Sequence, residues 1–120
     1  MALKVTIEEK GNTCLIYPEG DIDTVTYRYF EDKIDPAITE NTKAVVINMA
    51  GVDYISSMGL SVLIKTKKKV EKMGGEFMLT NMQPQIKKVF EVAHIIPDII
   101  AFKSVEEADA FLDKIQKSDN

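Results

Sequence analysis

Two adjacent serines, Ser56 and Ser57, are the residues of this 120-residue chain whose positions point most directly to chemistry. They stand between an apolar run that predicts a buried strand and an amphipathic stretch that predicts a helix. A serine hydroxyl at such a junction can cap the helix, accept a phosphate or attack a substrate as a nucleophile. The surrounding residues help to decide among these uses.

A hydrolase nucleophile at Ser57 is disfavoured by its neighbours. The nucleophile elbow needs glycine two residues before and two residues after the serine, whereas this chain has Ile55 and Gly59 there. The one histidine, His94, ends an apolar helical face and is interpreted as a buried or capping residue. Cys14 lies in a predicted strand and is interpreted as a small core residue. We therefore predict that the chain is not an enzyme, with catalysis by Ser57 or His94 as the weakest hypothesis.

No cofactor or metal site is predicted, because the chain has neither glycine-rich nucleotide motif, no zinc-ligand spacing and no EF-hand loop. A net charge of −4 and a pI near 5.0 disfavour nucleic acid and anionic membranes as partners. Charged residues interrupt every apolar run well before the roughly 20 residues that a membrane span needs, and no signal-peptide pattern is present. With a single cysteine as well, the sequence predicts a cytoplasmic protein.

Length and composition predict one α/β domain over residues 1–120, with a frayed tail at about 117–120. The hydrophobic pattern predicts about five strands and four helices in the order β-β-α-β-α-β-α-β-α. Strands are expected near residues 3–8, 13–17, 44–49, 76–80 and 99–102, and helices near 24–38, 59–73, 84–94 and 104–115. Strands that alternate with helices imply crossover connections and a mixed, mostly parallel sheet.

Several local features set the expected boundaries. Pro18 and Gly20 are expected to end the second strand, Thr24 to cap the first helix, and Pro36 to end or kink that helix. The run 44–49 lacks alternation, which predicts a central strand covered by helices on both faces. The lysines between 65 and 72 are interpreted as a solvated helix face, or as a rim for an acidic partner or a nucleotide phosphate.

The segment 45–60 resembles the STAS domain, and in particular the bacterial anti-sigma factor antagonists of that family. Their loop has the form valine-x-Phe/Tyr-x-Asp/Ser-Ser-x-Gly-Leu, and here its positions are filled by Val52, Tyr54, Ser56, Ser57, Gly59 and Leu60. The resemblance extends over nearly the whole chain through residues 20–23, Asn81, Pro84 and 104–108. It implies a single STAS-type domain.

The resemblance also implies a function. In these antagonists the serine corresponding to Ser57 is phosphorylated by an anti-sigma factor that is also a kinase, and the unphosphorylated form binds that partner and frees a sigma factor. A phosphatase can reverse the switch. Register with Gly59 and Leu60 favours Ser57 over Ser56 as the acceptor. The implied partner-binding residues are Asp21, Asp23, Tyr54, Ser56, Ser57, Met58 and Gly59, and the chain is expected to be a monomer or weak dimer.

Two positions depart from the family pattern. Ser56 stands where many antagonists have aspartate, and Asn48 stands where the buried strand usually ends in aspartate. Both changes remove a negative charge, and the first removes it directly beside the acceptor. The alternative hypothesis is therefore a constitutive scaffold or ligand-binding module of a stress-signalling or transport complex, in which the serines only cap a helix.

Overall fold

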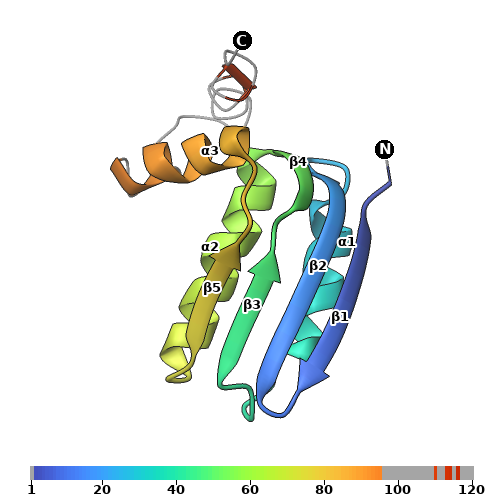
Figure 1. Cartoon of the computed structure of the whole chain (residues 1–120), viewed down its shortest axis with the longest axis vertical. Coiled ribbons are helices and arrows are strands. Elements are labelled where there is room, and N and C mark those ends of the chain that lie inside the picture. Colours follow the sequence, from blue (N-terminus) through green and yellow to red (C-terminus); the bar gives the residue numbers. More distant parts are fainter. Residues whose placement is uncertain (1, 96–109, 111–112, 115, 117–120) are drawn as a thin grey trace.

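The computed structural model describes residues 2–95, 110, 113, 114 and 116, and within them a single sheet is flanked by helices (Figure 1). Its strands are β1 (Lys4–Lys10), β2 (Thr13–Ile22), β3 (Ala44–Asn48), β4 (Gly51–Ile55) and β5 (Glu76–Thr80). Its helices are α1 (Tyr27–Ile34), the short 3-10 helix η1 (Asp35–Ala37), α2 (Ser57–Lys72) and α3 (Pro84–Ile95). The strand predicted at 99–102 lies outside the described residues, as does most of the helix predicted at 104–115. Residues 110, 113 and 114 of that predicted helix are helical, and so is residue 116 after it.

The sheet is mixed and mostly parallel, as predicted, and β2 is its hub. β1 pairs antiparallel with one edge of β2, after a turn in which Gly11 has φ +60°. Two strands share the other edge of β2 in parallel, since β3 pairs with residues 13–16 and β4 pairs with residues 19–22. β5 pairs in parallel with the far side of β3.

The prediction that Pro18 and Gly20 end the second strand is wrong. β2 runs through both residues to Ile22. Pro18 lies between the segment that pairs with β3 and the segment that pairs with β4, so its missing N–H falls where that edge changes partners. Gly20 has φ +122° at an irregularity in the pairing with β4. The extension carries Asp21 and Ile22 to the end of the sheet where the serines lie.

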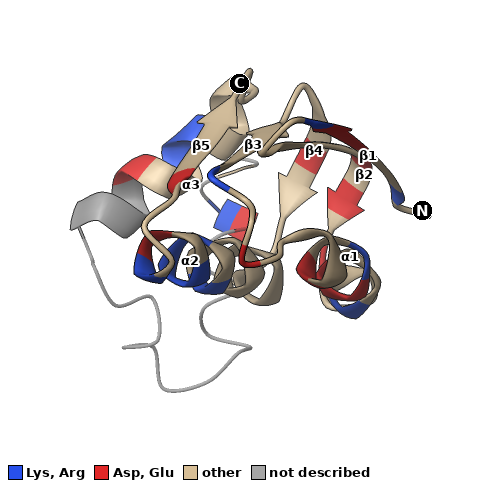
Figure 2. Ribbon diagram, turned by 90° about the horizontal axis from the view of Figure 1, so that it is seen from below, with Lys and Arg blue, Asp and Glu red and all other residues tan. Residues whose placement is uncertain are grey.

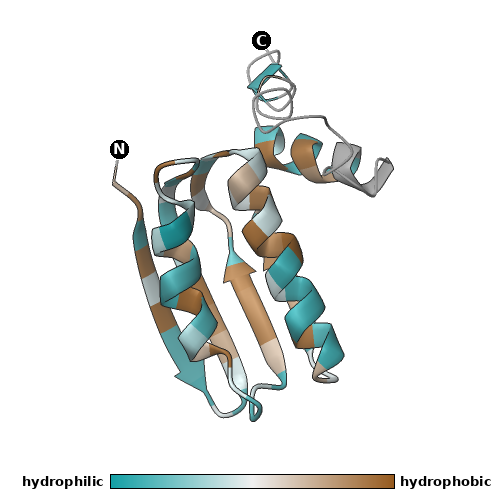
Figure 3. Cartoon of the chain, turned by 180° about the vertical axis from the view of Figure 1, so that it is seen from behind, coloured by the Kyte–Doolittle hydropathy of each residue, from teal (hydrophilic) through white to brown (hydrophobic). Residues whose placement is uncertain are grey.

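The prediction that β3 is covered on both faces is also wrong for the described helices. Both α1 and α2 lie over the same face of the sheet (Figure 3). Val45 and Ile47 point to this face and are buried, whereas Val46 is half-buried on the other face. The pairing places Leu15, Val46 and Met78 in one row across that open face. The core therefore lies mainly between one sheet face and the helices α1 and α2, and it also includes Ile86 and Val89 of α3.

The first helix begins later than predicted. Thr26, rather than Thr24, precedes its first residue. The Asp23 carboxylate accepts hydrogen bonds from the backbone N–H groups of Val25 (2.9 Å) and Thr26 (3.0 Å), which folds this segment before α1. The prediction for Pro36 is confirmed, because α1 ends at Ile34 and Pro36 lies in η1.

Strand β4 was not predicted. Residues 51–55 were assigned to a loop, but they pair with the end of β2. As a result the described part of the sheet has five strands without the strand predicted at 99–102. None of the helices in the described ranges combines the length and the apolar character that crossing a membrane requires.

Candidate functional site

The two serines lie in a very short connection between a strand and a helix, here called the β4–α2 junction (residues 54–59). β4 ends at Ile55 and α2 begins at Ser57, so Ser56 alone links them. Ser56 has extended backbone angles, and its Oγ accepts a hydrogen bond from the N–H of Gly59 at 3.2 Å. Its own N–H donates to the Ile22 carbonyl of β2 at 2.8 Å. Ser56 is therefore the N-cap of α2, a structural role that needs no phosphate.

Ser57 is the first residue of α2, where the backbone N–H groups of the first turn and the helix dipole favour negative charge. Its exposed fraction is only 6%, and that of Ser56 is 2%. Gly59 explains part of this close packing, because a Cβ at Gly59 would lie 2.5 Å from the Ile22 carbonyl oxygen. The structure thus places Ser57 where a phosphate suits the helix but where space is limited.

The predicted site residues from β2 do meet the junction. Asp21 pairs with Tyr54 across the β2–β4 ladder, and Ile22 pairs with Ile55. Asp23 follows directly, with its carboxylate engaged by the N–H groups that precede α1. The structure thus shows Asp23 forming a turn, whereas its predicted partner-binding role stays a prediction.

The carboxyl group of Asp21 has a pKa above its ordinary value of 3.8, because burial disfavours its charge and because Asp23 and Asp53 repel it. The ionised Asp21 carboxylate therefore lowers the free energy of unfolding at neutral pH. This loss disappears once the pH falls below the ordinary pKa of aspartate, because the group is then protonated in both the folded and the unfolded chain. We expect Asp21→Asn to melt at a higher temperature than the wild type at pH 7. The melting temperatures of the variant and the wild type should converge near pH 3. A variant that melts at a lower temperature than the wild type at pH 7 would contradict this account.

The outer side of the junction continues into the contact between α1 and α2. A hollow of about 150 Å³ lies there, lined by Tyr27, Glu31, Met58, Ser61, Val62 and Lys65. Met58 is half-buried in this lining. A partner that binds at the junction would therefore meet an apolar surface as well as the serines.

The lysines of α2 are engaged mainly with neighbouring carboxylates. The Nζ of Lys65 lies 2.8 Å from Glu31 of α1, and the Nζ of Lys69 lies 2.7 Å from Asp35 of η1. Figure 2 shows the mixed charges of the two helices below the sheet. This arrangement supports the interpretation of an ordinary solvated face, because these two lysines have anionic partners within the chain itself.

Residues that sequence reasoning missed also hold β4 in place. The Gln83 amide donates to the Ala50 carbonyl and to the Asp53 carboxylate, both at 3.0 Å. The Gln85 amide donates to the Asp53 carbonyl at 2.9 Å.

Near the C-terminus, Asp113 accepts a hydrogen bond from the Tyr54 hydroxyl, and Gln116 contacts the backbone of Ile55. No local pattern marks these glutamines, although the strand-forming residues Val52, Tyr54 and Ile55 were an available signal for β4.

Asn48, the second departure from the family pattern, forms a local turn. Its side-chain oxygen accepts a hydrogen bond from the Ala50 N–H at 3.0 Å, between β3 and β4. An aspartate would accept the same bond, so asparagine preserves this turn without the charge.

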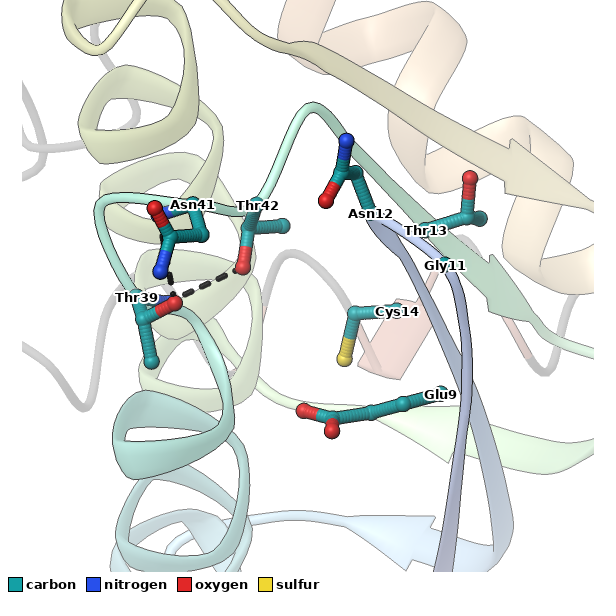
Figure 4. A pocket seen from close by; sticks show the side chains of 8 residues that line it. All are labelled: Glu9, Gly11, Asn12, Thr13, Cys14, Thr39, Asn41 and Thr42. Carbon is teal, nitrogen blue, oxygen red and sulfur yellow. Dashed lines mark hydrogen bonds between the residues drawn. The ribbon is translucent and has the colours of Figure 1, made fainter.

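A polar hollow of about 370 Å³ lies at the other end of β2, far from the serines (Figure 4). Its threonines are engaged in folding the loop, since the Thr42 hydroxyl accepts from the Thr39 N–H at 3.0 Å and the Thr39 hydroxyl accepts from Asn41 at 3.3 Å. Cys14 also lines it, and burial together with the nearby Glu9 carboxylate raises the pKa of its thiol. A raised pKa lowers the thiolate fraction, which fits a core cysteine better than a nucleophile.

Catalytic chemistry has little support in the described residues. They contain no group of three or more His, Cys, Asp or Glu side chains arranged to hold a metal ion. The backbone of His94 belongs to α3, and its side chain lies outside the described part of the structure. What the junction offers is two serine hydroxyls at the start of a helix, with a partly apolar hollow beside them.

Comparisons with known proteins agree with this geometry. The family model described as the STAS domain matches residues 4–108. The chain is 27% identical to the anti-sigma-B factor antagonist of Bacillus subtilis, with 89% of this chain and 96% of that protein covered. It is also 27% identical to the anti-sigma F factor antagonist of Lysinibacillus sphaericus, with 71% and 74% covered. Among solved structures, it resembles the Bacillus cell fate determinant SpoIIAA in its phosphorylated form, with a TM-score of 0.64, 22% identity, and 78% and 86% coverage.

Proposed function

Because this chain belongs to the STAS domain family, we propose that it is an anti-sigma factor antagonist that is switched by phosphorylation of Ser57. In its unphosphorylated form it binds an anti-sigma factor that is also a serine kinase, and so frees a sigma factor. Phosphorylation ends this binding, and a phosphatase restores it. The chain itself performs no catalysis, uses no cofactor and acts in the cytoplasm as a monomer or weak dimer.

The position of Ser57 at the start of α2 carries this proposal. A phosphate adds about 1.5 to 2 negative charges at neutral pH, and the first turn of a helix is where such charge is best tolerated. Ser56 is less suited to be the acceptor, because its Oγ already caps α2. At a contact surface, the same charge would repel a partner or would have to lose its hydration at a cost in binding free energy. Phosphorylation therefore affects partner binding more than the stability of the fold. The relatives named as anti-sigma factor antagonists support the antagonist role, and the phosphorylated form of SpoIIAA supports phosphorylation as its control.

The surface around the junction fits a protein partner. Val25 is 86% exposed in the segment before α1, and Tyr29 of α1 is 44% exposed. Burial raises the pKa of Asp21, and the nearby carboxylates of Asp23 and Asp53 raise it further, so these three acidic residues concentrate negative charge beside the junction. An anti-sigma factor with apolar and basic side chains at its contact surface would complement this combination.

A constitutive STAS scaffold or ligand-binding module is the second candidate function. The burial of Ser57 and the capping bond of Ser56 favour it, because both are complete without any modification. In that case the serines stabilise the start of α2, and the chain binds its partners in a single state.

Incubation with ATP and the anti-sigma factor kinase of the same organism separates the two candidates. We expect one phosphate per chain, located at Ser57 by peptide mass spectrometry. Ser56→Ala should still accept it, whereas Ser57→Ala should not. Phosphate on Ser56, or none on a wild-type chain that still binds the kinase, would favour the constitutive module.

A further inference from the structure

Two residues near the C-terminus contact the strand that leads into the serines. The Tyr54 hydroxyl donates to the carboxylate of Asp113, which lies 59 positions later in the chain. The Ile55 N–H donates to the side-chain oxygen of Gln116 at 3.0 Å, and the Gln116 amide nitrogen donates to the Ile55 carbonyl at 2.8 Å. We call these contacts the C-terminal clasp.

The clasp supplies hydrogen bonds to β4 that a further neighbouring strand would otherwise make. Ser56 donates its N–H to Ile22 in β2. In a strand, the N–H and C=O groups of one residue point to the same edge, and those of the next residue point to the other edge. Ile55 therefore presents both groups away from β2. The Gln116 side chain has one donor and one acceptor in the positions that a neighbouring strand would supply, and it is only 9% exposed while it does so.

Other contacts around the junction leave it little freedom. α2 is anchored by the buried Leu60 and Leu63, and the backbone at Gly59 is packed against Ile22. β4 is bonded to β2 on one edge, and its central residue Asp53 accepts hydrogen bonds from Gln83 before α3 and from Gln85 in α3. The clasp differs from these contacts because its side chains bond Tyr54 and Ile55, the two residues directly before Ser56, from 59 and 61 positions later in the chain.

Phosphorylation of Ser57 requires access that the closed structure does not give. With 6% of Ser57 exposed, a kinase has little room to bring ATP to its hydroxyl, and a bound phosphate would need additional volume. We propose that the C-terminal clasp covers the β4–α2 junction, and that Asp113 and Gln116 must release Tyr54 and Ile55 before a protein partner gains full access to Ser57. This inference rests on the proposed function for its biological meaning, but its geometry can be tested without any kinase.

Thiol labelling at position 57 gives that test. Ser57→Cys introduces a thiol at the junction, and the native Cys14 is buried and serves as an internal reporter of global unfolding. We would measure the rate of reaction with iodoacetamide at each cysteine in the full-length chain, using peptide mass spectrometry under native conditions. Val25→Cys, at an exposed position, gives the rate of an unprotected thiol.

Adding Gln116→Ala to Ser57→Cys should raise the labelling rate at position 57 by about 30-fold, because each lost hydrogen bond changes an opening equilibrium by about fivefold. Asp113→Asn should give a smaller rise, since it weakens the bond with Tyr54 and leaves Gln116 in place. The matched control is Lys114→Ala, an exposed neighbour, which should leave the rate unchanged.

The result at Cys14 decides the interpretation. Faster labelling at position 57 with unchanged labelling at Cys14 supports a local clasp. An unchanged rate at position 57 in the Gln116→Ala chain would overturn it, and so would a parallel rise at both cysteines, which would mean that only global unfolding exposes the site. A chain that passes this test and yet accepts no phosphate would retain the clasp and lose the proposed phosphorylation.

Discussion

Gly59→Ala is expected to lower the free energy of unfolding by about 3 kcal/mol and the melting temperature by about 10 °C. In an uncrowded helix the same change would increase stability by about 1 kcal/mol, because alanine is the better helix former. Here the added Cβ would lie 2.5 Å from the Ile22 carbonyl oxygen and 2.7 Å from its Cγ2 atom. The first contact is with backbone, which cannot move aside as a flexible side chain can. Crowding therefore outweighs helix propensity.

The damage should be concentrated at the junction. To relieve the clash, α2 must move away from β2, which weakens the 2.8 Å hydrogen bond from Ser56 to Ile22. Thermal melts monitored by circular dichroism measure the loss, with Ser61→Ala as the control on the same helix. A Gly59→Ala chain as stable as the wild type would mean that the start of α2 is not packed against β2 as described.

Ser57→Asp is expected to weaken binding to the anti-sigma factor by about 100-fold or more, because introducing charge at a buried contact typically costs a few kcal/mol. The fold should tolerate the same change, since the carboxylate stands at the N-terminus of α2. Isothermal titration calorimetry with the purified partner measures the affinity, and a thermal melt verifies the fold. The combination of weak binding and near-normal melting is the expected result.

Ser57→Asn separates charge from size. Asparagine has nearly the shape of aspartate and no charge, so it should bind the partner far more tightly than the Ser57→Asp chain does. Ser57→Ala should bind like the wild type. Equal weakening by asparagine and aspartate would show that the contact excludes larger side chains irrespective of charge, and full binding by aspartate would contradict a charge switch.

Periodicity predicted the elements that depend on local patterns. Helix α2 was expected at 59–73 and runs over Ser57–Lys72, and β5 was expected and found at 76–80. The predictions that were wrong concern features that depend on strand pairing. Pro18 was expected to stop β2, but the strand passes between two parallel partners there, and no local pattern shows where those partners start and end.

The candidate site was only partly predictable. The resemblance located Ser56, Ser57 and Gly59, and the structure shows the contacts that make this spacing necessary: a cap, a helix start and a close approach to β2. Asp113 and Gln116 could not be predicted, because their contacts depend on side chains that meet β4 from about 60 residues away. Hydrogen bonds of this kind leave no periodic signal in a sequence.

The pairing of β2 also has a consequence for how the chain folds during synthesis. The hairpin with β1 is local and can form as soon as residue 22 has emerged from the ribosome, but the other edge of β2 must wait for residues 44–48 and 51–55. Until then it presents unpaired backbone groups along an apolar strand, which is the form most prone to associate with other nascent chains. Lower growth temperatures and early binding of a chaperone should therefore increase the yield of native protein. Their main effect should fall in the interval before residues 44–55 have been synthesised.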